Sequence, residues 1–198
     1  MAQAPQAMIR TARLVLDPLH PADAAGLFAC RADPDVARYQ GWKPASVDEA
    51  SAFITEQAQR TFGAAGWCQL AIRRRTGELV GDFGVHFPAA LDDPIEFGLS
   101  LGPSHQRKGY AREVMVAAID LAFGTWGYRR LVVSTDPRNT ASVALCRSLG
   151  LRQEAHHVES CRFRGEWADD LIFALLAREW PPRDEGRARA VAPHGTAP

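Results

Sequence analysis

The stretch "SHQRKGYAREVM" (residues 104–115) places three cations around a single glycine. The apolar run "IEFGLSLGP" (residues 95–103) precedes it and predicts a strand, and we expect a helix at residues 112–126. The first N–H groups of a helix lack intrahelical partners and carry partial positive charge, and a glycine lets a ligand come close to the backbone. The stretch therefore predicts an anion site, most naturally for a phosphate or pyrophosphate.

A solvated basic turn is the alternative for so short a motif, and the surrounding sequence decides between the two. The expected helix carries Met115, Ile119, Ala122 and Trp126 on one stripe. It should therefore pack on a sheet and hold its N-terminus against the end of the preceding strand. The chain has neither GxGxxG after its first strand nor GxxxxGK[ST], so the two common nucleotide-binding loops are not supported.

Outward from this stretch, strand and helix patterns alternate. We expect strands at residues 12–19, 67–75, 78–87, 95–102, 129–135, 151–163 and 169–177, and helices at 20–33, 33–40, 46–62, 112–126 and 139–150. Ser46 with Glu49 is a capping box for the third helix, and Gly150 should end the last one. Antiparallel strands joined to a β-α-β crossover predict an α+β (mixed α/β) fold, a mostly antiparallel twisted sheet of about seven strands flanked by helices.

The composition is that of an ordinary globular domain. A formal net charge of zero disfavours binding to nucleic acid. Cys30, Cys68, Cys146 and Cys161 form no CxxC, so we expect neither a metal site nor a redox dithiol. No apolar run approaches the roughly 20 residues that span a bilayer, and we expect a cytoplasmic protein without membrane contact. One domain is expected at residues 9–180, between a flexible N-terminus (1–8) and a disordered tail (181–198).

The segment "QRKGYA" (residues 106–111) resembles the Q/R-x-x-G-x-G/A signature of the GNAT acyltransferases, which binds the pyrophosphate of acetyl-CoA. Four further segments resemble the branch that includes the ribosomal-protein N-terminal acetyltransferases. They are "TARLVLDPLHPADAAGLF", "DPDVARY", "LVGDFGVHF" and "NTASVALCRSLGLRQEA", and the resemblance runs in order from about residue 9 to 180. It implies the GNAT fold, acetyl-CoA as co-substrate and N-acetyltransferase activity.

The resemblance also implies which residues hold the donor. The strand before the loop should diverge from its neighbour and offer its backbone to pantetheine, and a backbone N–H near Leu99 would stabilise the oxyanion. Asn139 should cap its helix and contact the cofactor arm. The residues assigned to acetyl-CoA are Leu99, Ser100, Leu101, Gln106, Arg107, Lys108, Gly109, Tyr110, Ala111, Arg112, Asn139 and Ser142.

The groups that would move protons leave alternatives open. Glu96 is polar amid apolar neighbours in the strand that leads to the loop, and a half-buried glutamate could have a raised pKa suited to a general base. Glu159, expected beside the acceptor cleft in this branch, is its rival. Many GNAT enzymes carry a tyrosine seven residues after the helix-start asparagine, where this chain has Cys146. Ser142 is therefore favoured over Cys146 as the group at the CoA sulfur.

The acceptor is the least defined part. We expect a primary amine, either a protein N-terminal α-amine or a small-molecule amine, bound by residues 38–46, 87–94 and 161–167. The alternatives are an aminoglycoside-type acetyltransferase and a non-catalytic acyl-CoA sensor or partner-binding domain. The family resemblance also allows a homodimer formed through C-terminal strands.

Overall fold

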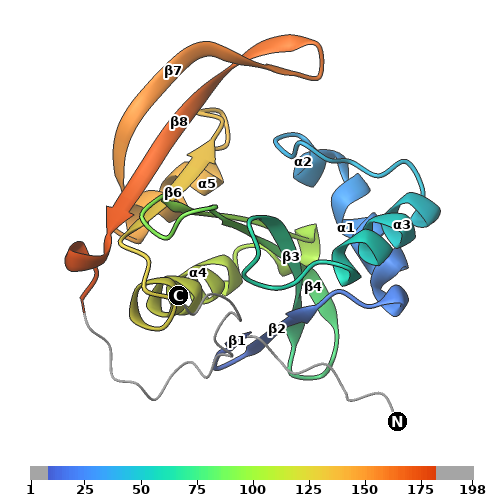
Figure 1. The fold of residues 1–198 in the computed structure, drawn as a ribbon. Coiled ribbons are helices and arrows are strands. Elements are labelled where there is room, and N and C mark those ends of the chain that lie inside the picture. Colours follow the sequence, from blue (N-terminus) through green and yellow to red (C-terminus); the bar gives the residue numbers. More distant parts are fainter. Residues whose placement is uncertain (1–8, 182–198) are drawn as a thin grey trace.

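The computed structural model describes residues 9–181, which form one mixed sheet with helices on both faces (Figure 1). The eight strands of this part follow the order β1-β2-β3-β4-β5-β6-β8-β7. The predicted fold class is confirmed. The predictions for residues 1–8 and for nearly all of the tail lie outside the described residues, and the single domain at 9–180 stays a prediction.

The strands and helices have the following bounds. The strands are β1 (Ile9–Arg10), β2 (Leu14–Pro18), β3 (Gly66–Arg74), β4 (Leu79–Phe87), β5 (Ile95–Leu101), β6 (Arg130–Thr135), β7 (Arg152–Phe163) and β8 (Glu166–Leu176). The α-helices are α1 (Ala24–Ala32), α2 (Pro34–Ala37), α3 (Val47–Ala58), α4 (Tyr110–Gly124) and α5 (Thr140–Ser148). Three short 3-10 turns are η1 (Pro21–Asp23), η2 (Pro103–His105) and η3 (Ala177–Glu179).

The sheet has one strand more than the sequence predicted. β1 has two residues and pairs with β2, where Ile9 lies opposite Leu16 and is fully buried. Two residues are too few to show an alternating pattern, so only tertiary pairing identifies this strand. The remaining seven strands were predicted, with differences of a few residues at their ends.

The central crossover is β5-α4-β6, and β5 and β6 are parallel. α4 begins two residues earlier than predicted, because Gly109 in the left-handed conformation serves as its N-cap. It also ends two residues earlier, at Gly124, although Trp126 beyond it is still buried. The predicted β-α-β unit is thus confirmed, with the whole helix moved toward the loop.

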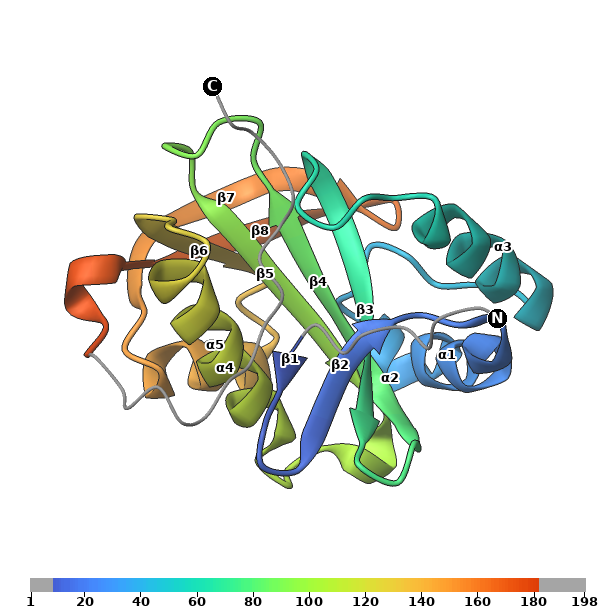
Figure 2. The ribbon, with the colours of Figure 1, turned by 60° about the horizontal axis from the view of Figure 1, so that its bottom comes forward.

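The two faces of the sheet carry different helices. On one face, α4 and α5 pack with Ile95, Phe97, Leu131 and Phe173 in the main core, and Figure 2 shows α4 beside β5. On the other face, α1 and α3 cover a smaller apolar cluster that contains Ala71 of β3. Side chains of a strand alternate between the faces, so polar residues between core positions of β5 and β8 point toward the side of α1–α3.

A buried ion pair fixes α1 to the sheet. The Arg31 guanidinium donates from Nε and Nη2 to the two carboxylate oxygens of Asp82 on β4, and both side chains are almost fully buried. Arg31 also donates to Gln40 Oε1 at 2.9 Å. Because an uncompensated buried charge is costly, this pair holds the segment after α2 in a defined place.

Helix ends confirm the predicted glycine after α5 and one half of the predicted capping box. Ser46 caps α3 by accepting a hydrogen bond from the Glu49 N–H, although the Glu49 carboxylate accepts from the N–H of Ala45 rather than from that of Ser46. Gly150 has a φ of 83° directly after α5, as expected for a C-terminal glycine.

β7 and β8 form a long hairpin at one edge of the sheet. Figure 1 shows it extending beyond the other strands, and nearly all of β7 is exposed. Within residues 9–181, no helix is both long and apolar enough to cross a membrane.

Candidate active site

β5 and β6 separate after their first residues. Ile95 pairs with Leu131 and Glu96 with Val132, and within residues 9–181 no further pair joins the two strands. β4 still pairs with β5 as far as Leu101, and β8 with β6 as far as Thr135. The sheet therefore opens between β5 and β6 from residue 97 onward. Alternate backbone N–H and C=O groups of β5 face this gap without a strand partner.

The chain turns into α4 at the end of β5. Arg107 has a φ of 57° and Gly109 one of 80°. A left-handed backbone at a residue other than glycine costs about 1–2 kcal/mol, and strain of this kind clusters at functional sites. Among the described residues, no group accepts a hydrogen bond from the N–H groups of residues 107–112. These N–H groups at a helix start, next to left-handed residues, have the geometry of an anion site.

Side chains fix this loop to the strand and leave its cations free. Gln106 Nε2 donates to the carbonyl oxygen of Leu101 at 3.0 Å, so this side chain ties the loop to β5. Tyr110 and Ala111 are half-buried and pack against the main core. Three cations are exposed on the loop and the first turn of the helix: Arg107, Lys108 and Arg112. The predicted loop residues are therefore together in space, with apolar side chains inward and charges outward.

The strand residues assigned to pantetheine have buried or half-buried side chains. Leu101 is 7% exposed, and Leu99 packs against the main core. Ser100 is buried opposite Asp82, and its hydroxyl has no hydrogen-bond partner among the described residues. Because side chains of a strand point to its two faces, the backbone of these three residues is the part that borders the gap.

α5 begins on the other side of the gap. Asn139 caps it by accepting a hydrogen bond from the Ser142 N–H at 3.2 Å, as predicted. Ser142 is half-buried, whereas Cys146 is 1% exposed within the core. Burial raises the pKa of the Cys146 thiol to about 11, which makes it a weaker acid than a free thiol.

Glu96 stands where the strands separate. Its neighbours Ile95 and Phe97 belong to the main core, so its side chain lies on the opposite face, the side of α1–α3. Burial is the main cause that raises the pKa of Glu96; the nearby charge of Asp170 adds to it, and His86 opposes it. His86 lies directly across from Glu96 on β4, and its ring is 5.3 Å from that of Trp67.

Asp170 completes this polar group. Leu171 of β8 is in the main core, so Asp170 lies on the same face as Glu96. Its carboxylate accepts a hydrogen bond from the Ser134 hydroxyl of β6 at 2.7 Å. Glu96, His86 and Asp170 therefore form a titratable cluster at the base of the gap.

The rival carboxylate is not part of this cluster. Glu159 is exposed in the irregular part of β7, with a φ of 47°, and its N–H donates to Asp169. β6 and β8 lie between β5 and β7, so three interstrand steps of about 4.8 Å each separate the strands of Glu96 and Glu159.

Two contacts border the face that carries Glu96. The Tyr39 hydroxyl donates to the carbonyl oxygen of Arg138 at 3.1 Å, which joins the segment after α2 to the loop before α5. The Arg164 guanidinium, at the tip of the hairpin, donates to the carbonyl oxygen of Ala37 at 2.7 Å. Residues 38–46 and the hairpin, both predicted to bind the acceptor, thus approach each other from distant parts of the sequence.

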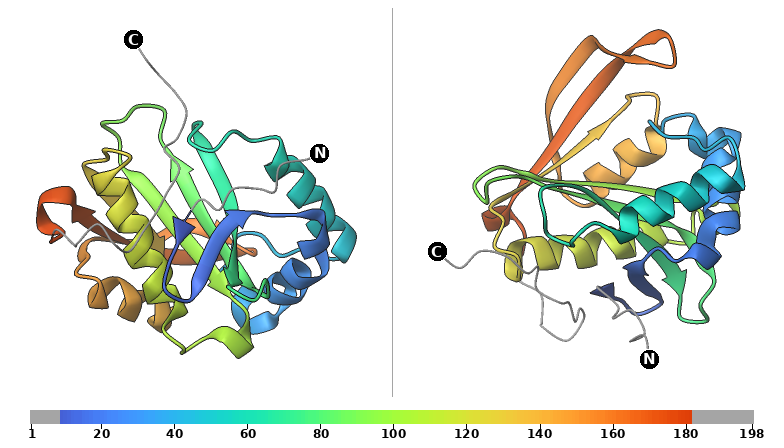
Figure 3. Two further views of the ribbon diagram at one scale, coloured as in Figure 1. Left: turned by 90° about the horizontal axis from the view of Figure 1, so that it is seen from below. Right: turned by 45° about the vertical axis from the view of Figure 1, so that its right-hand side comes forward.

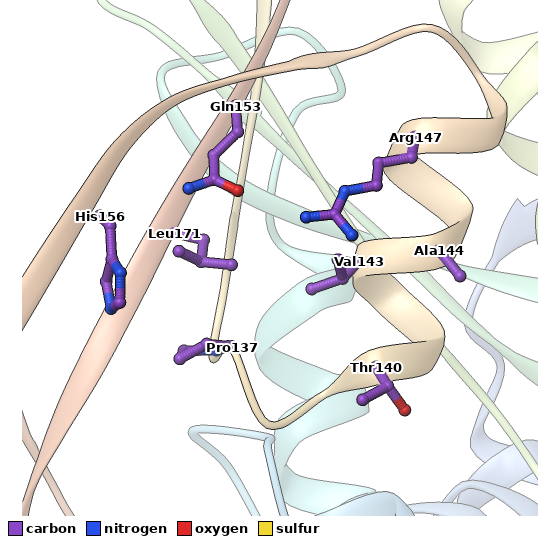
Figure 4. A pocket seen from close by; sticks show the side chains of 8 residues that line it. All are labelled: Pro137, Thr140, Val143, Ala144, Arg147, Gln153, His156 and Leu171. Carbon is purple, nitrogen blue, oxygen red and sulfur yellow. The ribbon is translucent and has the colours of Figure 1, made fainter.

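A cavity of about 360 Å³ lies elsewhere, between α5 and the hairpin (Figure 4). Its walls include Thr140, Val143 and Arg147 of α5, His156 of β7 and Leu171 of β8. None of the residues predicted for catalysis is part of its lining.

Sequence reasoning missed several residues of this region. His86 and Asp170 escaped notice because only the strand register brings them to Glu96. A polar histidine in the apolar run "LVGDFGVHF" was the one available signal. Arg13 and Glu113, which contact the loop before α4, were also missed, since they are far apart in sequence.

Comparisons with known proteins agree with this geometry. The family model described as an acetyltransferase (GNAT) domain matches residues 13–152. The uncharacterized N-acetyltransferase YoaA of Bacillus subtilis is 33% identical over 177 residues, which covers 85% of this chain and 96% of that protein.

Solved structures show the same fold. A proposed ribosomal-protein-serine acetyltransferase of Vibrio cholerae has a TM-score of 0.75 and 26% identity, covering 88% of this chain and 99% of the other. The spermidine N-acetyltransferase of Vibrio cholerae, solved with CoA and spermine, has a TM-score of 0.71 and 20% identity, covering 84% and 96%. The resemblance found in the sequence is confirmed: the chain is an N-acetyltransferase and belongs to the GNAT acetyltransferase family.

Proposed function

We propose that the protein transfers the acetyl group of acetyl-CoA to the α-amine of a polypeptide N-terminus, by direct attack in a ternary complex. The observation that carries this proposal is the gap between β5 and β6, with unpaired N–H groups at its outer end and the half-buried Glu96 at its base. The unpaired N–H groups suit the phosphates of the donor, and Glu96 suits an amine acceptor that has to lose a proton.

Acetyl-CoA supplies an activated acetyl group, and the residues around the gap fit its shape and charge. The N–H groups of residues 107–111 would bind the pyrophosphate, with Arg107, Lys108 and Arg112 adding positive charge. The backbone of Leu99, Ser100 and Leu101 would bind the pantetheine amides. Gln106 would act through the loop, because its side chain already bonds to Leu101. Asn139 would contact the cofactor arm from the start of α5.

Glu96 is the proposed general base. Its carboxylate is half-buried, lies on the acceptor side of the sheet, and has a pKa raised mainly by burial. A raised pKa improves a carboxylate as a proton acceptor, because the ideal catalytic pKa is close to the working pH. Glu96 would accept the proton that the amine loses when its nitrogen attacks the thioester carbon.

The remaining steps involve charge on oxygen and on sulfur. A backbone N–H near Leu99 would stabilise the negative charge that develops on the thioester oxygen. Ser142 would donate a hydrogen bond to the departing sulfur. Its half-buried hydroxyl is more accessible than the Cys146 thiol, whose pKa burial raises to about 11.

The proton chemistry favours an α-amine as acceptor. An α-amine has a pKa near 7.7–8.0, whereas an alkyl amine such as that of lysine has one of roughly 10.4. At neutral pH a single weak base can therefore deprotonate the former far more readily. The likeness to the proposed ribosomal-protein-serine acetyltransferase supports the same choice. A small polyamine is the second candidate, since the spermidine enzyme shares the fold.

The test is CoA release with a panel of amines at fixed acetyl-CoA. The panel contains short peptides with free N-termini, the same peptides with blocked N-termini, spermidine and an aminoglycoside. We expect turnover with free N-termini and none with the blocked peptides. Turnover with spermidine or the aminoglycoside alone would contradict the proposed acceptor. A cytoplasmic location and a homodimer remain predictions from the sequence.

A further inference from the structure

The turn between β1 and β2 contacts the loop before α4 through one side chain. Arg13 Nε donates to Glu113 Oε2 at 2.6 Å, and an Nη atom donates to the carbonyl oxygen of Lys108 at 2.9 Å. The guanidinium carbon is 4.7 Å from the centre of the Tyr110 ring, within the range of a cation–π contact. The left view of Figure 3 shows this turn beside the start of α4.

The bond to Lys108 determines where the next N–H points. A peptide unit is planar and trans, so its C=O and N–H point in opposite directions. Because the Lys108 carbonyl points to Arg13, the Gly109 N–H points away from Arg13, to the other side of the loop. That N–H is one of those without a partner among the described residues.

Arg13 also limits what can stand at position 109. A Cβ added to Gly109 would lie 3.3 Å from an Nη atom of Arg13, in addition to the left-handed φ of 80°. The guanidinium therefore packs directly against the glycine backbone. Arg13 therefore supports the peptide between residues 108 and 109 on the side opposite to the Gly109 N–H.

Glu113 anchors Arg13 in turn. Its carboxylate accepts hydrogen bonds from the Thr11 hydroxyl at 2.5 Å and from the Arg13 N–H at 2.8 Å, besides the bond from Nε. Burial alone would raise the pKa of Glu113, but the bonds from Thr11 and Arg13 together lower it. The carboxylate is thus ionised in the first turn of α4, where it would repel a bound anion if Arg13 did not neutralise it.

We propose that Arg13 and Glu113 are positioning residues for acetyl-CoA, which orient the Gly109 N–H toward the pyrophosphate without touching the ligand themselves. This inference rests on the proposed role of the loop. Arg13 lies on the side of β1 and β2, opposite to the direction of that N–H. Arg13 and Glu113 would therefore affect the binding of the pyrophosphate of acetyl-CoA and not the binding of its pantetheine arm.

The test compares two donors. We expect Arg13→Ala to raise the KM for acetyl-CoA and the Kd of CoA about tenfold, the size expected when charge-assisted hydrogen bonds are lost, with kcat and the KM of the amine unchanged. Acetyl-pantetheine has no pyrophosphate, so its kcat/KM should be the same for Arg13→Ala and the parent. Arg13→Lys, which keeps the charge but not the forked geometry, should show most of the effect.

Arg10→Ala is the matched control, because Arg10 is exposed on β1 of the same segment. It should leave both donors unaffected. An equal loss with acetyl-CoA and acetyl-pantetheine would show a general structural effect and overturn the inference. So would an unchanged Kd of CoA in Arg13→Ala. If Gly109→Asp, measured beside them, also binds CoA normally, the role of the loop itself fails; if it binds weakly, only the role of Arg13 fails.

Discussion

The loop at residues 106–112 and the hairpin of β7 and β8 lie on either side of the gap between β5 and β6, and they are held very differently. Gln106 and Arg13 fix the loop from two sides, through the Leu101 and Lys108 carbonyl groups. The hairpin is mostly exposed, irregular between His157 and Cys161, and bonds to α2 through Arg164. The loop proposed to bind the donor is therefore held by side chains on two sides, whereas the hairpin proposed to bind the acceptor is more exposed and less regular.

This difference has a consequence for function. Changes in the loop should weaken the reaction equally for every amine, because every amine uses the same donor. Changes in the hairpin should alter one acceptor relative to another and leave donor binding intact. The predictions below begin with the largest effect, on the donor side, and end with the smallest, on the acceptor side.

Gly109→Asp should weaken CoA binding by at least about 100-fold, because it forces a side chain onto a left-handed residue and adds an anion beside the pyrophosphate. Calorimetric titration with CoA measures this. Gly41→Asp is the control: an added Cβ at Gly41 meets no atom within 4 Å, and residue 41 belongs to the segment predicted to bind the acceptor. If CoA bound to the two variants with equal Kd values, the loop at residues 106–112 would have no special role in binding the donor.

Glu96→Gln should lower kcat/KM at neutral pH by about 10- to 100-fold, within the range of a general base. Because burial raises the pKa of Glu96, the rate of the parent should rise as the pH passes that raised value and the carboxylate ionises. The variant should lack this rise, and the difference should shrink at high pH, where the amine is already neutral.

Glu159→Gln serves as the comparison for this prediction, since Glu159 was the alternative base. Its pH–rate profile should follow that of the parent. A profile in which Glu159→Gln loses the rise and Glu96→Gln keeps it would reverse the assignment.

The same raised pKa makes a prediction for stability. The folded protein holds the Glu96 proton more tightly than the unfolded chain, so the contribution of Glu96 is most favourable at low pH and is lost as pH rises through the raised pKa. Glu96→Gln should therefore raise the midpoint of thermal unfolding at pH 7.5, but not at pH 4. A lower midpoint at pH 7.5 but not at pH 4 would show instead that the ionised carboxylate stabilises the fold.

Ser142→Ala should lower kcat by about fivefold through loss of a hydrogen bond to the departing sulfur. Cys146→Ala should change kcat less than twofold and lower the midpoint of thermal unfolding, because Cys146 is part of the packed core. The opposite pattern, in which kcat falls only in Cys146→Ala, would contradict this prediction. It would identify the Cys146 thiol as the group that donates a proton to the departing sulfur.

Arg164→Ala should have the smallest effect, about a two- to threefold change in the KM of the amine with no change in the Kd of CoA, since it removes one partly exposed hydrogen bond. Arg162→Ala is the matched variant, because Arg162 contacts the hairpin itself, through the Gly165 carbonyl and the Trp167 ring. Steady-state kinetics with two different peptides measure both. An altered Kd of CoA in Arg164→Ala would mean that the hairpin also shapes the donor side.

The same contrast explains how much the sequence could predict. The backbone shape of the loop at residues 106–112 was predictable because these residues are contiguous and a glycine before a helix has a specific backbone meaning; its binding of the donor stays a prediction. The cap at Asn139 and the β-α-β unit were predictable for the same local reason. α4 begins two residues earlier than predicted, because Gly109 caps it. A periodic apolar pattern cannot define the first residue of a helix so closely.

The acceptor side depends on contacts between distant segments. Glu96 meets His86 and Asp170 only after β4, β5, β6 and β8 have paired in register. Glu159 was a plausible rival in the sequence because it shares a segment with the acceptor cleft, and only the strand order places two strands between it and β5. The support of the loop by Arg13 is equally non-local, since it joins residues about 100 positions apart.

Amide hydrogen exchange with and without CoA tests the donor side most directly, because it reports each backbone N–H separately. We predict that CoA slows exchange at residues 107–112 and 97–101, and leaves the hairpin of β7 and β8 unchanged. Protection of the hairpin or of the cavity beside α5, with residues 107–112 unaffected, would contradict the account.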